Sequence, residues 1–454
     1  MKFGTDGVRG VANSELTAEF ALRLGRAAAR VLSTDGAASV VLAKVVIGGD
    51  TRVSTPMLEA ALAAGFAAEG VDVRHLGVVP TPAVAFAAQR SGAMGAMVSA
   101  SHNPYRDNGI KLFATGGVKL TDDIEAAIER ELDAMQPPIG QPGRIAALGD
   151  AAPGRDGPGG DEIADYVDHV VAIAEGRAAS TLRIVVDAAN GAASALARTV
   201  FERVGADVVV IGDEPDGTNI NEACGATYPA TVAKAVLAHG ADVGIALDGD
   251  ADRLIAVDHT GRVVDGDHII AIAALDLMAR GLLANDTVVV TTMTNLGFHH
   301  AMRAAGVAVV TTDVGDRYVL EALADGGHVL GGEQSGHVIF ADHATTGDGM
   351  LTAVALLDII GRSGHSLADL AAAAMTSLPQ VLVNVEVSER VPDVAELLAT
   401  DVARLESELA GSGRVLLRPS GTEPLVRVMV EAATAAEADR IADDLASVVR
   451  ARFT

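Results

Sequence analysis

The sequence predicts an α/β protein with several domains, and three observations lead to this fold class. The chain has 454 residues, whereas single hydrophobic cores stop growing beyond about 250–300 residues. Short apolar runs alternate with helical stretches through most of the chain, as expected for the buried strands of mostly parallel sheets. After Pro379 the order changes to several strands followed by one helix, which predicts a smaller α+β domain.

The first helix is predicted after Thr17, whose hydroxyl can cap it, because apolar residues follow at helical spacing: Phe20, Leu24, Ala28 and Val31. Another helix start is expected at Thr55-Pro56, where proline occupies the first helical position. The predicted strands of this part are the short apolar runs at 45–48, 95–98, 182–187, 208–211, 243–247, 287–290 and 307–310. Together they predict stacked units of strand, loop and helix.

The C-terminal part has a different pattern. Strands are predicted at 381–387, 414–417 and 426–430. The helix that follows starts at the capping box 434–437, and its apolar face carries Ile441, Leu445 and Val448. Strands that pack against a single long helix indicate a small α+β domain.

Domain boundaries are predicted where these patterns lapse. Residues 136–160 are rich in proline and glycine, which excludes a regular helix or strand and indicates an interdomain connection. Softer changes fall near 257–264 and 375–379. The chain is therefore divided into three similar mixed α/β domains, at 1–150, 160–257 and 258–374, and a smaller C-terminal α+β domain at 378–454.

The composition excludes several classes of protein and partner. Apolar residues make up 49% and charged residues 21% of the chain, which excludes a disordered protein. The 34 Lys and Arg against 60 Asp and Glu give a net charge of −26, which repels phosphate backbones and anionic lipid headgroups. We therefore expect no nucleic acid and no membrane among the partners.

The cysteine content and the N-terminal sequence bear on localisation. The single cysteine, Cys224, cannot form an internal disulfide, which fits a reducing compartment. The N-terminal residues lack the apolar stretch of a signal peptide, and no uncharged run reaches the roughly 18 residues of a membrane span. A cytoplasmic protein is expected.

The sharpest motif is an acidic loop between the apolar runs 243–247 and 254–257. Asp248, Asp250 and Asp252 alternate in it, and their mutual repulsion calls for a cation that prefers oxygen ligands, Mg²⁺ or Ca²⁺. An EF-hand is excluded, because Arg253 and His259 stand where its loop requires Gly and Glu. A solvated acidic turn without metal is the alternative.

The second motif is the hexapeptide 99–104, directly after the apolar run at 95–98. A hydroxyl at the end of a strand, here Ser101, is well placed to act as a nucleophile or phosphoryl carrier. His102 or Lys111 would supply proton transfer or charge, and a turn held by Ser and Asn side chains is the alternative. No serine lies in G-x-S-x-G, and neither G-x-x-x-x-G-K-[ST] nor G-x-G-x-x-G occurs, which weakens triad, kinase and dinucleotide interpretations.

Two further loops have compositions suited to ligands. Residues 418–424 and Arg427 combine guanidinium groups, hydroxyls and a glycine, which is typical of a phosphate cradle, with an ordinary hairpin loop as the alternative. Residues 331–337 combine acid, amide, hydroxyl and imidazole groups with glycine, which suits a polyhydroxyl ligand. Taken alone the second indication is weak, because a histidine such as His337 is more often a loop or core residue.

These four loops, in this order and one in each predicted domain, resemble the α-D-phosphohexomutase superfamily. The similarity runs from 3–10 to the last pair of strands and covers nearly the whole chain. It implies that the domains surround one central cleft and that the protein is a phosphosugar mutase, an intramolecular phosphotransferase of the isomerase class. It also implies a small sugar phosphate as the partner and allows a homodimer.

The resemblance assigns roles at the reacting end. Ser101 is implied to be the phosphoserine, and its phosphate would bind one Mg²⁺ per chain together with Asp248, Asp250 and Asp252. Arg253 would lie beside this metal, and the reacting end would be lined by Arg9, His102 and Lys111.

The other two loops are assigned to the substrate. The resemblance implies that sugar hydroxyls are bound by Glu333, Ser335 and His337. It implies that the phosphate that does not react is bound by Arg418, Ser420, Gly421, Thr422 and Arg427.

Two segments are similar to the branch of the superfamily that acts on glucosamine phosphates, namely 332–337 and 314–318. That branch interconverts glucosamine 6-phosphate and glucosamine 1-phosphate through glucosamine 1,6-bisphosphate, toward UDP-N-acetylglucosamine and peptidoglycan. The alternatives are a phosphomannomutase or phosphoglucomutase of the same superfamily and a non-catalytic phosphosugar-binding protein.

Gly49 and Asp313 depart from the family pattern, which often has Arg and Lys there, and these departures bear on phosphate affinity or domain closure.

Overall fold

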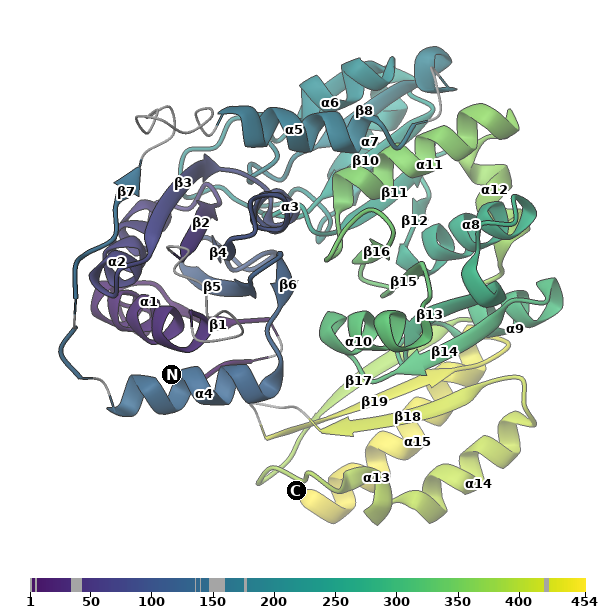
Figure 1. Cartoon of the computed structure of the whole chain (residues 1–454). Helices are drawn as coiled ribbons and strands as arrows, with labels where there is room; N and C mark the ends of the chain where they lie inside the picture. The colour runs from purple at the N-terminus through teal and green to yellow at the C-terminus, as the bar shows by residue number, and fades with distance from the viewer. Residues whose placement is uncertain are drawn as a thin grey trace. The chain divides into compact units, whose positions relative to one another are not determined.

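A computed structural model describes residues 2–4, 6–33, 43–134, 136–138, 140–146, 160–174, 178–419 and 424–454. The chain forms two compact units, of which the first comprises 1–293 and 307–374 and the second 294–306 and 375–454. The first unit contains three sheets with their helices, and the second contains one sheet (Figure 1). No helix among the described residues is long and apolar enough to span a membrane.

The first sheet has the strand order β1-β5-β4-β2-β3-β7, with β6 paired to β5. Its strands are β1 (Val8–Val11), β2 (Lys44–Gly49), β3 (Asp72–Val78), β4 (Met94–Val98), β5 (Asp107–Ala114), β6 (Val118–Lys119) and β7 (Ile145–Ala146). Its helices are α1 (Ala18–Leu32), α2 (Thr55–Ala68), α3 (Thr81–Ser91) and α4 (Asp122–Ala134). β2, β3 and β4 are parallel, whereas β5 is antiparallel to both β4 and β1.

The second sheet has the order β12-β11-β10-β8-β9. Its strands are β8 (Arg183–Asp187), β9 (Asp207–Ile211), β10 (Val243–Leu247), β11 (Leu254–Asp258) and β12 (Val263–Val264). The helices of this part are α5 (Gly160–Val171), α6 (Ala197–Val204) and α7 (Ala230–His239), with a 3₁₀ turn at Ala178–Thr181. β8 and β10 are parallel, and the hairpin β10–β11 confirms the predicted strand, acidic loop and strand.

The third sheet has the order β14-β13-β15-β16. Its strands are β13 (Thr287–Thr291), β14 (Ala308–Thr312), β15 (Leu330–Gly332) and β16 (Val338–Phe340). The helices are α8 (Gly266–Ala279), α10 (Asp316–Gly326), α11 (Gly349–Ser363) and α12 (Leu367–Ala374), with a 3₁₀ turn at Ala284–Asp286. The antiparallel pair β15–β16 places the loop 333–337 at its tip.

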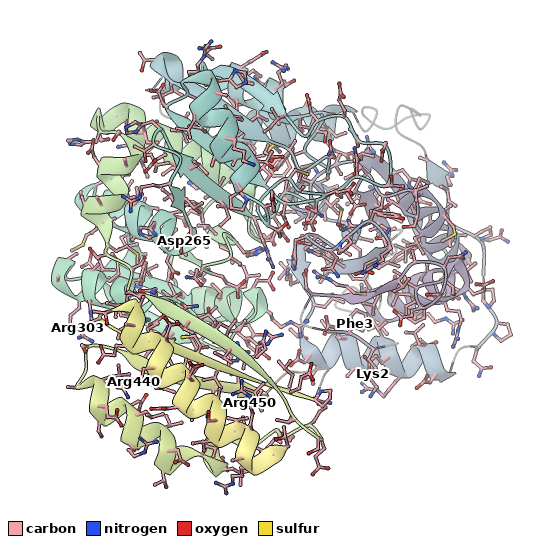
Figure 2. All side chains as sticks on the ribbon, turned by 180° about the vertical axis from the view of Figure 1, so that it is seen from behind. Lys2, Phe3, Asp265, Arg303, Arg440 and Arg450 are labelled. Atoms are coloured by element: carbon pink, nitrogen blue, oxygen red, sulfur yellow. The ribbon has the colours of Figure 1, made fainter. Side chains whose placement is uncertain are left out.

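The second unit contains the three strands and the long helix that the sequence predicts for a C-terminal α+β domain, and it also includes 294–306. Its sheet β17-β19-β18 is antiparallel and consists of β17 (Gln380–Glu386), β18 (Arg414–Pro419) and β19 (Leu425–Glu431). Its helices are α9 (Leu296–Ala305), α13 (Val394–Leu397), α14 (Ala399–Leu409) and α15 (Ala435–Phe453). Thr434 caps α15 as predicted, and the exposed side of this helix carries Arg440 and Arg450 (Figure 2).

The predicted fold class is confirmed, with one difference in the sheets. The sequence indicated mostly parallel sheets, but each of the first three sheets also has antiparallel strands, introduced by the hairpins and by β5. β5 was missed as a strand because its first residues, Asp107 to Gly109, have the composition of a loop. Asn108 is nevertheless fully buried, which shows that polar residues of this strand serve contacts inside the protein.

Two glycines determine how closely α1 and α2 pack in the first unit. A Cβ atom on Gly25 of α1 would lie 2.4 Å from the Leu62 carbonyl oxygen, and one on Gly65 of α2 would lie 2.2 Å from the Leu22 carbonyl oxygen. Real Cβ atoms do not approach backbone this closely, so the helices touch backbone to backbone at these positions. This contact supports the core beneath the first sheet, where Leu24, Leu62 and Phe66 are fully buried.

We predict that Gly65→Ala lowers the free energy of unfolding by about 1–3 kcal/mol, because the added methyl group forces the two helices apart. Ala60→Ser, on the exposed side of the same helix, should change it by less than about 0.5 kcal/mol. Urea unfolding of the two variants measures the difference. Equal stabilities would show that α1 and α2 can separate without cost.

Candidate active site

Ser101 follows β4 and is held in an unusual backbone conformation. Its φ is +51°, in the left-handed region that side chains other than glycine seldom adopt and that costs roughly 1–2 kcal/mol. Its carbonyl oxygen accepts hydrogen bonds from Arg52 Nη2 at 3.1 Å and Asn221 Nδ2 at 2.9 Å. Its N–H donates to Ser99 Oγ at 2.9 Å. These contacts fix the Ser101 backbone and aim its hydroxyl.

Buried polar residues behind Ser101 make this support rigid. Ser99 Oγ donates to Asp50 Oδ2 at 2.6 Å, and Arg52 forms a buried ion pair with Asp50. Arg52 also donates to the Asn103 carbonyl oxygen at 2.6 Å. Burial raises the pKa of Asp50, although the charge of Arg52 and the hydrogen bond from Ser99 oppose the shift.

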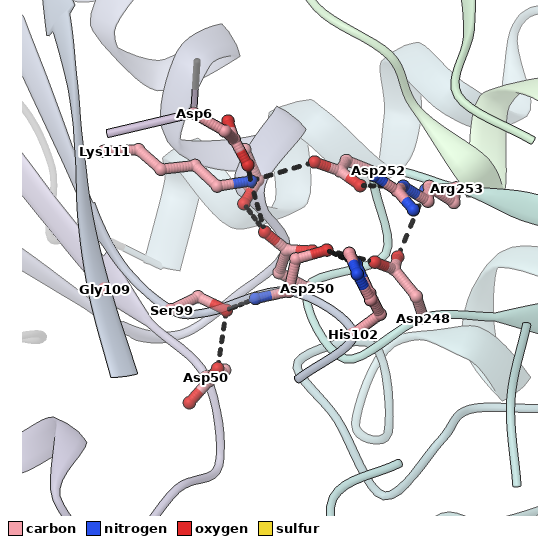
Figure 3. A network of polar contacts seen from close by, with 12 residues as sticks. Asp6, Asp50, Ser99, His102, Gly109, Lys111, Asp248, Asp250, Asp252 and Arg253 are labelled. Atoms are coloured by element: carbon pink, nitrogen blue, oxygen red, sulfur yellow. Dashed lines mark hydrogen bonds and ion pairs between the residues drawn. The ribbon is translucent and has the colours of Figure 1, made fainter. Parts of the chain in front are cut away.

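The acidic loop between β10 and β11 brings its three carboxylates together (Figure 3). Ser101 lies beside them, in contact with Asp248. Asp248, Asp250 and Asp252 are buried, and one carboxylate oxygen of each lies within 4.8 Å of the others. Ser101 Oγ donates to Asp248 Oδ2 at 2.5 Å. Among the described residues this is the one group of acidic, histidine or cysteine side chains that is arranged to hold a metal ion.

The electrostatics of this loop fit a cation. Burial, together with the charges of Asp252 and Asp250, raises the pKa of Asp248 well above its usual range. Within the described part of the chain, the Oδ1 atom of Asp250 is buried without a hydrogen-bond partner, which is costly unless a positive group approaches it. Carboxylate oxygens are the ligands that Mg²⁺ and Ca²⁺ prefer, so the residues present fit a hard divalent cation.

Lys111 on β5 neutralises part of this charge. Its Nζ lies 2.9 Å from Asp250 Oδ2, 3.0 Å from Asp252 Oδ2 and 2.9 Å from Asp6 Oδ2. Burial opposes the charged form, but these carboxylates raise the pKa of Lys111 well above its usual range. Burial also opposes the charged form of Asp252, but the charge of Lys111 holds the pKa of Asp252 well below its usual range.

The remaining predicted residues of the reacting end lie at the same place. His102 Nδ1 is 3.3 Å from Ser101 Oγ, and burial, with the charges of Arg253 and Arg9, lowers the pKa of His102 to about 4. His102 is therefore neutral at pH 7. Arg253 donates its backbone N–H to Asp248 Oδ1 at 3.2 Å, and Arg9 pairs with Asp6.

The loop 333–337 of the third sheet reaches the acidic loop. The Leu254 N–H donates to the Gly336 carbonyl oxygen at 2.9 Å, and a Cβ on Gly336 would lie 2.1 Å from the Leu254 carbonyl oxygen. His337 Nδ1 lies 3.7 Å from Asp252 Oδ1, and the backbone nitrogen of Gly347 lies 3.1 Å from His337 Nε2. Burial opposes the charged form of His337, but the interaction with Asp252 and the charge of Asp316 raise its pKa.

Glu333 and Ser335 lie on the same loop and face each other. Glu333 Oε1 accepts the Gly315 N–H at 3.2 Å, and Ser335 Oγ lies 3.5 Å from Glu333 Oε2. Both residues are partly exposed, which leaves polar groups for a ligand.

The predicted phosphate cradle belongs to the second unit. Arg418 and Arg427 are directly opposite each other on β18 and β19. Like charges in this arrangement are unfavourable without an anion between or near them. Ser420, Gly421 and Thr422 lie outside the described residues.

Sequence reasoning missed several residues of the site. Asp50, Arg52, Ser99 and Asn221 support Ser101, and Asp6 binds Lys111. Their position in the sequence could have indicated them, because Asp50 and Arg52 follow the buried strand β2 and Ser99 follows β4.

Gly49 and Asp313 are the two positions that depart from the family pattern. Gly49 is explained by packing, because a Cβ there would lie 2.3 Å from Thr55 Cγ2 and 2.4 Å from Glu59 Oε1. Asp313 is exposed, and nothing in the structure explains it.

Comparison with known families shows that the chain matches all four domains of the phosphoglucomutase/phosphomannomutase family. Alpha/beta/alpha domain I matches residues 1–137, domain II 164–261, domain III 265–378 and the C-terminal domain 382–448.

Curated relatives cover nearly the whole chain. The phosphoglucosamine mutase of Frankia alni is 56% identical over 460 residues, which span 99% of this chain and 98% of the relative. The phosphoglucosamine mutase of Thermobifida fusca is 53% identical, with coverage of 99% and 98%.

Solved structures agree in fold. A phosphoglucomutase/phosphomannomutase family protein of Burkholderia thailandensis has a TM-score of 0.79 and 26% identity, covering 98% of this chain and 97% of that one. The N-acetylphosphoglucosamine mutase of Aspergillus fumigatus, solved in complex with GlcNAc-6P and magnesium, has a TM-score of 0.67. It is 20% identical, with coverage of 100% and 96%, which shows likeness of fold.

The four domains, with a buried serine against a carboxylate triad, define a phosphohexomutase, an isomerase-class phosphosugar mutase. Within that superfamily, the chain belongs to the phosphoglucosamine mutase family.

We predict that the carboxylate triad binds a divalent cation and that Asp250→Asn weakens its affinity by roughly tenfold or more, because one charged ligand is lost. Titration calorimetry with Mg²⁺ or Mn²⁺ measures the affinity without reference to turnover. Glu222→Gln removes an exposed carboxylate of the same domain and is the control. Unchanged affinity in Asp250→Asn would show that the cation binds elsewhere.

Proposed function

We propose that this enzyme interconverts glucosamine 6-phosphate and glucosamine 1-phosphate, with Ser101 as the phosphoryl carrier. The observation that supports it most directly is the contact of Ser101 Oγ with Asp248 Oδ2 at 2.5 Å, beside two further buried carboxylates. The identity of 56% over nearly the full length of a phosphoglucosamine mutase supports the choice of sugar. The proposal includes functional domains at 1–150, 160–257, 258–374 and 378–454.

The proposed cofactor is one Mg²⁺ per chain. Asp248, Asp250 and Asp252 would hold it together with an oxygen of the phosphate on Ser101. When bound, Mg²⁺ neutralises negative charge on the phosphoryl group that is being transferred.

The proposed reaction has two transfers. In the first, the C1 hydroxyl oxygen of glucosamine 6-phosphate attacks phosphoserine 101, so that the Ser101 Oγ–P bond breaks and a sugar O–P bond forms. The product is glucosamine 1,6-bisphosphate, and the proton of the C1 hydroxyl leaves to a base or to Ser101 Oγ. After the bisphosphate turns over, Ser101 Oγ attacks the phosphorus of the 6-phosphate, so that the bond between phosphorus and the C6 oxygen breaks and the Ser101 Oγ–P bond forms again. The C6 oxygen takes up the proton that Ser101 Oγ loses, directly or through a base, and glucosamine 1-phosphate leaves.

The residues of the reacting end have different capacities in these steps. Lys111 stays charged because its carboxylate neighbours raise its pKa, so it stabilises developing charge and is a poor base. His102 is neutral, with its pKa lowered to about 4, and its Nδ1 lies 3.3 Å from Ser101 Oγ, within reach of the proton in transfer. Arg9 and Arg253 supply further positive charge at the phosphoryl group.

The remaining residues are proposed to orient the substrate. Glu333, Ser335 and His337 would bind sugar hydroxyls. The phosphate that does not react would be held by Arg418, Ser420, Gly421, Thr422 and Arg427. Because the bisphosphate carries a phosphate at each end, the same cradle can hold either end before the second transfer.

We predict that Ser101→Ala abolishes mutase turnover and leaves glucosamine 6-phosphate binding within about threefold, because the variant loses the phosphoryl carrier alone. Intact mass of the wild type after incubation with the bisphosphate should show one added phosphoryl group, absent from the variant. Ser14→Ala, an exposed serine of the same domain, is the control. Undiminished turnover in Ser101→Ala would refute the mechanism.

We predict a higher kcat/KM for glucosamine 6-phosphate than for the 6-phosphates of glucose and mannose, measured with the same bisphosphate activator in each case. A preference for the mannose or glucose compound would favour the corresponding mutase of the superfamily. Substrate binding without turnover of any of the three would favour a non-catalytic binding protein.

A further inference from the structure

Six side chains form a closed ring of alternating acidic and basic groups at the edge of the site. We call it the acid–base ring, and its members in order are Asp6, Lys119, Asp316, His337, Asp252 and Lys111. The nitrogen-to-oxygen distances are 3.1 Å for Lys119–Asp6, 3.4 Å for His337–Asp316, 3.7 Å for His337–Asp252, 3.0 Å for Lys111–Asp252 and 2.9 Å for Lys111–Asp6. Lys119 and Asp316 form the sixth pair.

The ring joins three domains. Asp6, Lys111 and Lys119 lie in the first matched domain, Asp252 lies in the second, and Asp316 and His337 lie in the third. Asp316 is the first residue of α10 and belongs to the segment 314–318, which the proposed reaction leaves without a role. It is 8% exposed, so its carboxylate interacts mainly with protein groups.

Asp316 is the ring member that links His337, on the loop 333–337, to Lys119. Its Oδ2 contacts Lys119 on one side and His337 on the other. Lys119 shares Asp6 with Lys111, and His337 shares Asp252 with Lys111. The preceding residue, Gly315, donates its N–H to Glu333. Asp316 is therefore connected to Lys111 through Lys119 and Asp6, and also through His337 and Asp252. A change at Asp316 would alter the position of Lys111 through these contacts, and that of the loop 333–337 through His337.

We propose that Asp316 is a positioning residue for phosphoryl transfer: it holds Lys119 and His337 so that Lys111 and the loop 333–337 face the reacting groups together. This inference rests on the proposed mutase function. Asp316 acts through other side chains, because the ion pairs that it forms among the described residues are with Lys119 and His337. The contact between Lys119 and Asp316 is a charge-assisted hydrogen bond between largely buried groups, and such bonds hold a site to the tolerance that catalysis requires.

A second ion pair between the same two domains provides a matched comparison. Arg317, the next residue along α10, pairs with Asp122 and Glu125 of α4. The Asp122 side chain is 78% exposed. The pair of Asp122 with Arg317 joins the first and third domains, as the pair of Lys119 with Asp316 does. Asp122, Glu125 and Arg317 do not belong to the acid–base ring.

The test compares Asp316→Asn with Asp122→Asn in the full chain, with Mg²⁺ and glucosamine 6-phosphate. Asp316→Asn should lower kcat/KM roughly 10- to 100-fold, mostly through kcat, as is typical when a support of catalytic groups is removed. Asp122→Asn should stay within about threefold, because exposed ion pairs contribute little. Equal effects of the two variants, or a loss confined to KM, would overturn the inference.

Lys119→Met tests the same contact from the other side, and it serves if Asp316→Asn fails to fold. It should reproduce the loss in kcat, and the double variant should be impaired less than the product of the two single effects, because both changes break one interaction. Fully multiplicative effects would show that Asp316 does not act through Lys119.

The sugar series with the wild type separates this inference from the proposed function. If the wild type prefers another sugar phosphate, the proposed substrate is wrong, and the variants are compared on the preferred sugar with the same expected ratios. A wild type inactive on all three sugar phosphates would overturn both.

Discussion

The burial of three like charges is the constraint on which the site depends. Asp248, Asp250 and Asp252 are withdrawn from water with oxygens within 4.8 Å of one another, an arrangement that repels strongly at low dielectric. The chain supplies one buried ammonium, Lys111, against two of them. Among the described residues, no group donates a hydrogen bond to the buried Oδ1 atom of Asp250, which suits a further cation at this place.

The same constraint explains why Ser101 needs rigid support. A serine hydroxyl facing Asp248 at 2.5 Å in a left-handed backbone conformation persists only if its surroundings hold it there. Asp50, Arg52 and Ser99 form that support within the first sheet, and Asn221 adds it from the neighbouring domain. Strain at the proposed phosphoryl carrier is thus balanced by a buried hydrogen-bond network.

The net charge of the whole chain differs from the local charge at the candidate active site. A value of −26 argues against polyanionic partners, yet the proposed substrate is itself an anion. The basic groups at the site are local: Arg9, Lys111, Lys119 and Arg253 lie among the carboxylates within the first unit. A bound cation would add to them, so the proposed sugar phosphate would meet positive groups inside an acidic protein.

The sequence by itself determined the fold class and predicted the kind of ligand that each loop would hold. Both are local: apolar runs at strand spacing predict the sheets, and the alternation of Asp248, Asp250 and Asp252 between two such runs predicts a cation site. Where polar residues are buried for function, the same reasoning failed, as for β5, whose first residues resemble a loop.

Only the tertiary structure decided which charges meet. Lys111 and Asp250 are 139 residues apart, and Lys119 and Asp316 are 197 apart, yet each pair is in direct contact. No spacing along the chain encodes such a pair, because the antiparallel strand β5 and the start of α10 are brought to the acidic loop by packing of separate domains. The sequence thus indicated the candidate reacting groups, and the packing of separate domains set their partners, because buried charges are stabilised by neighbours in space.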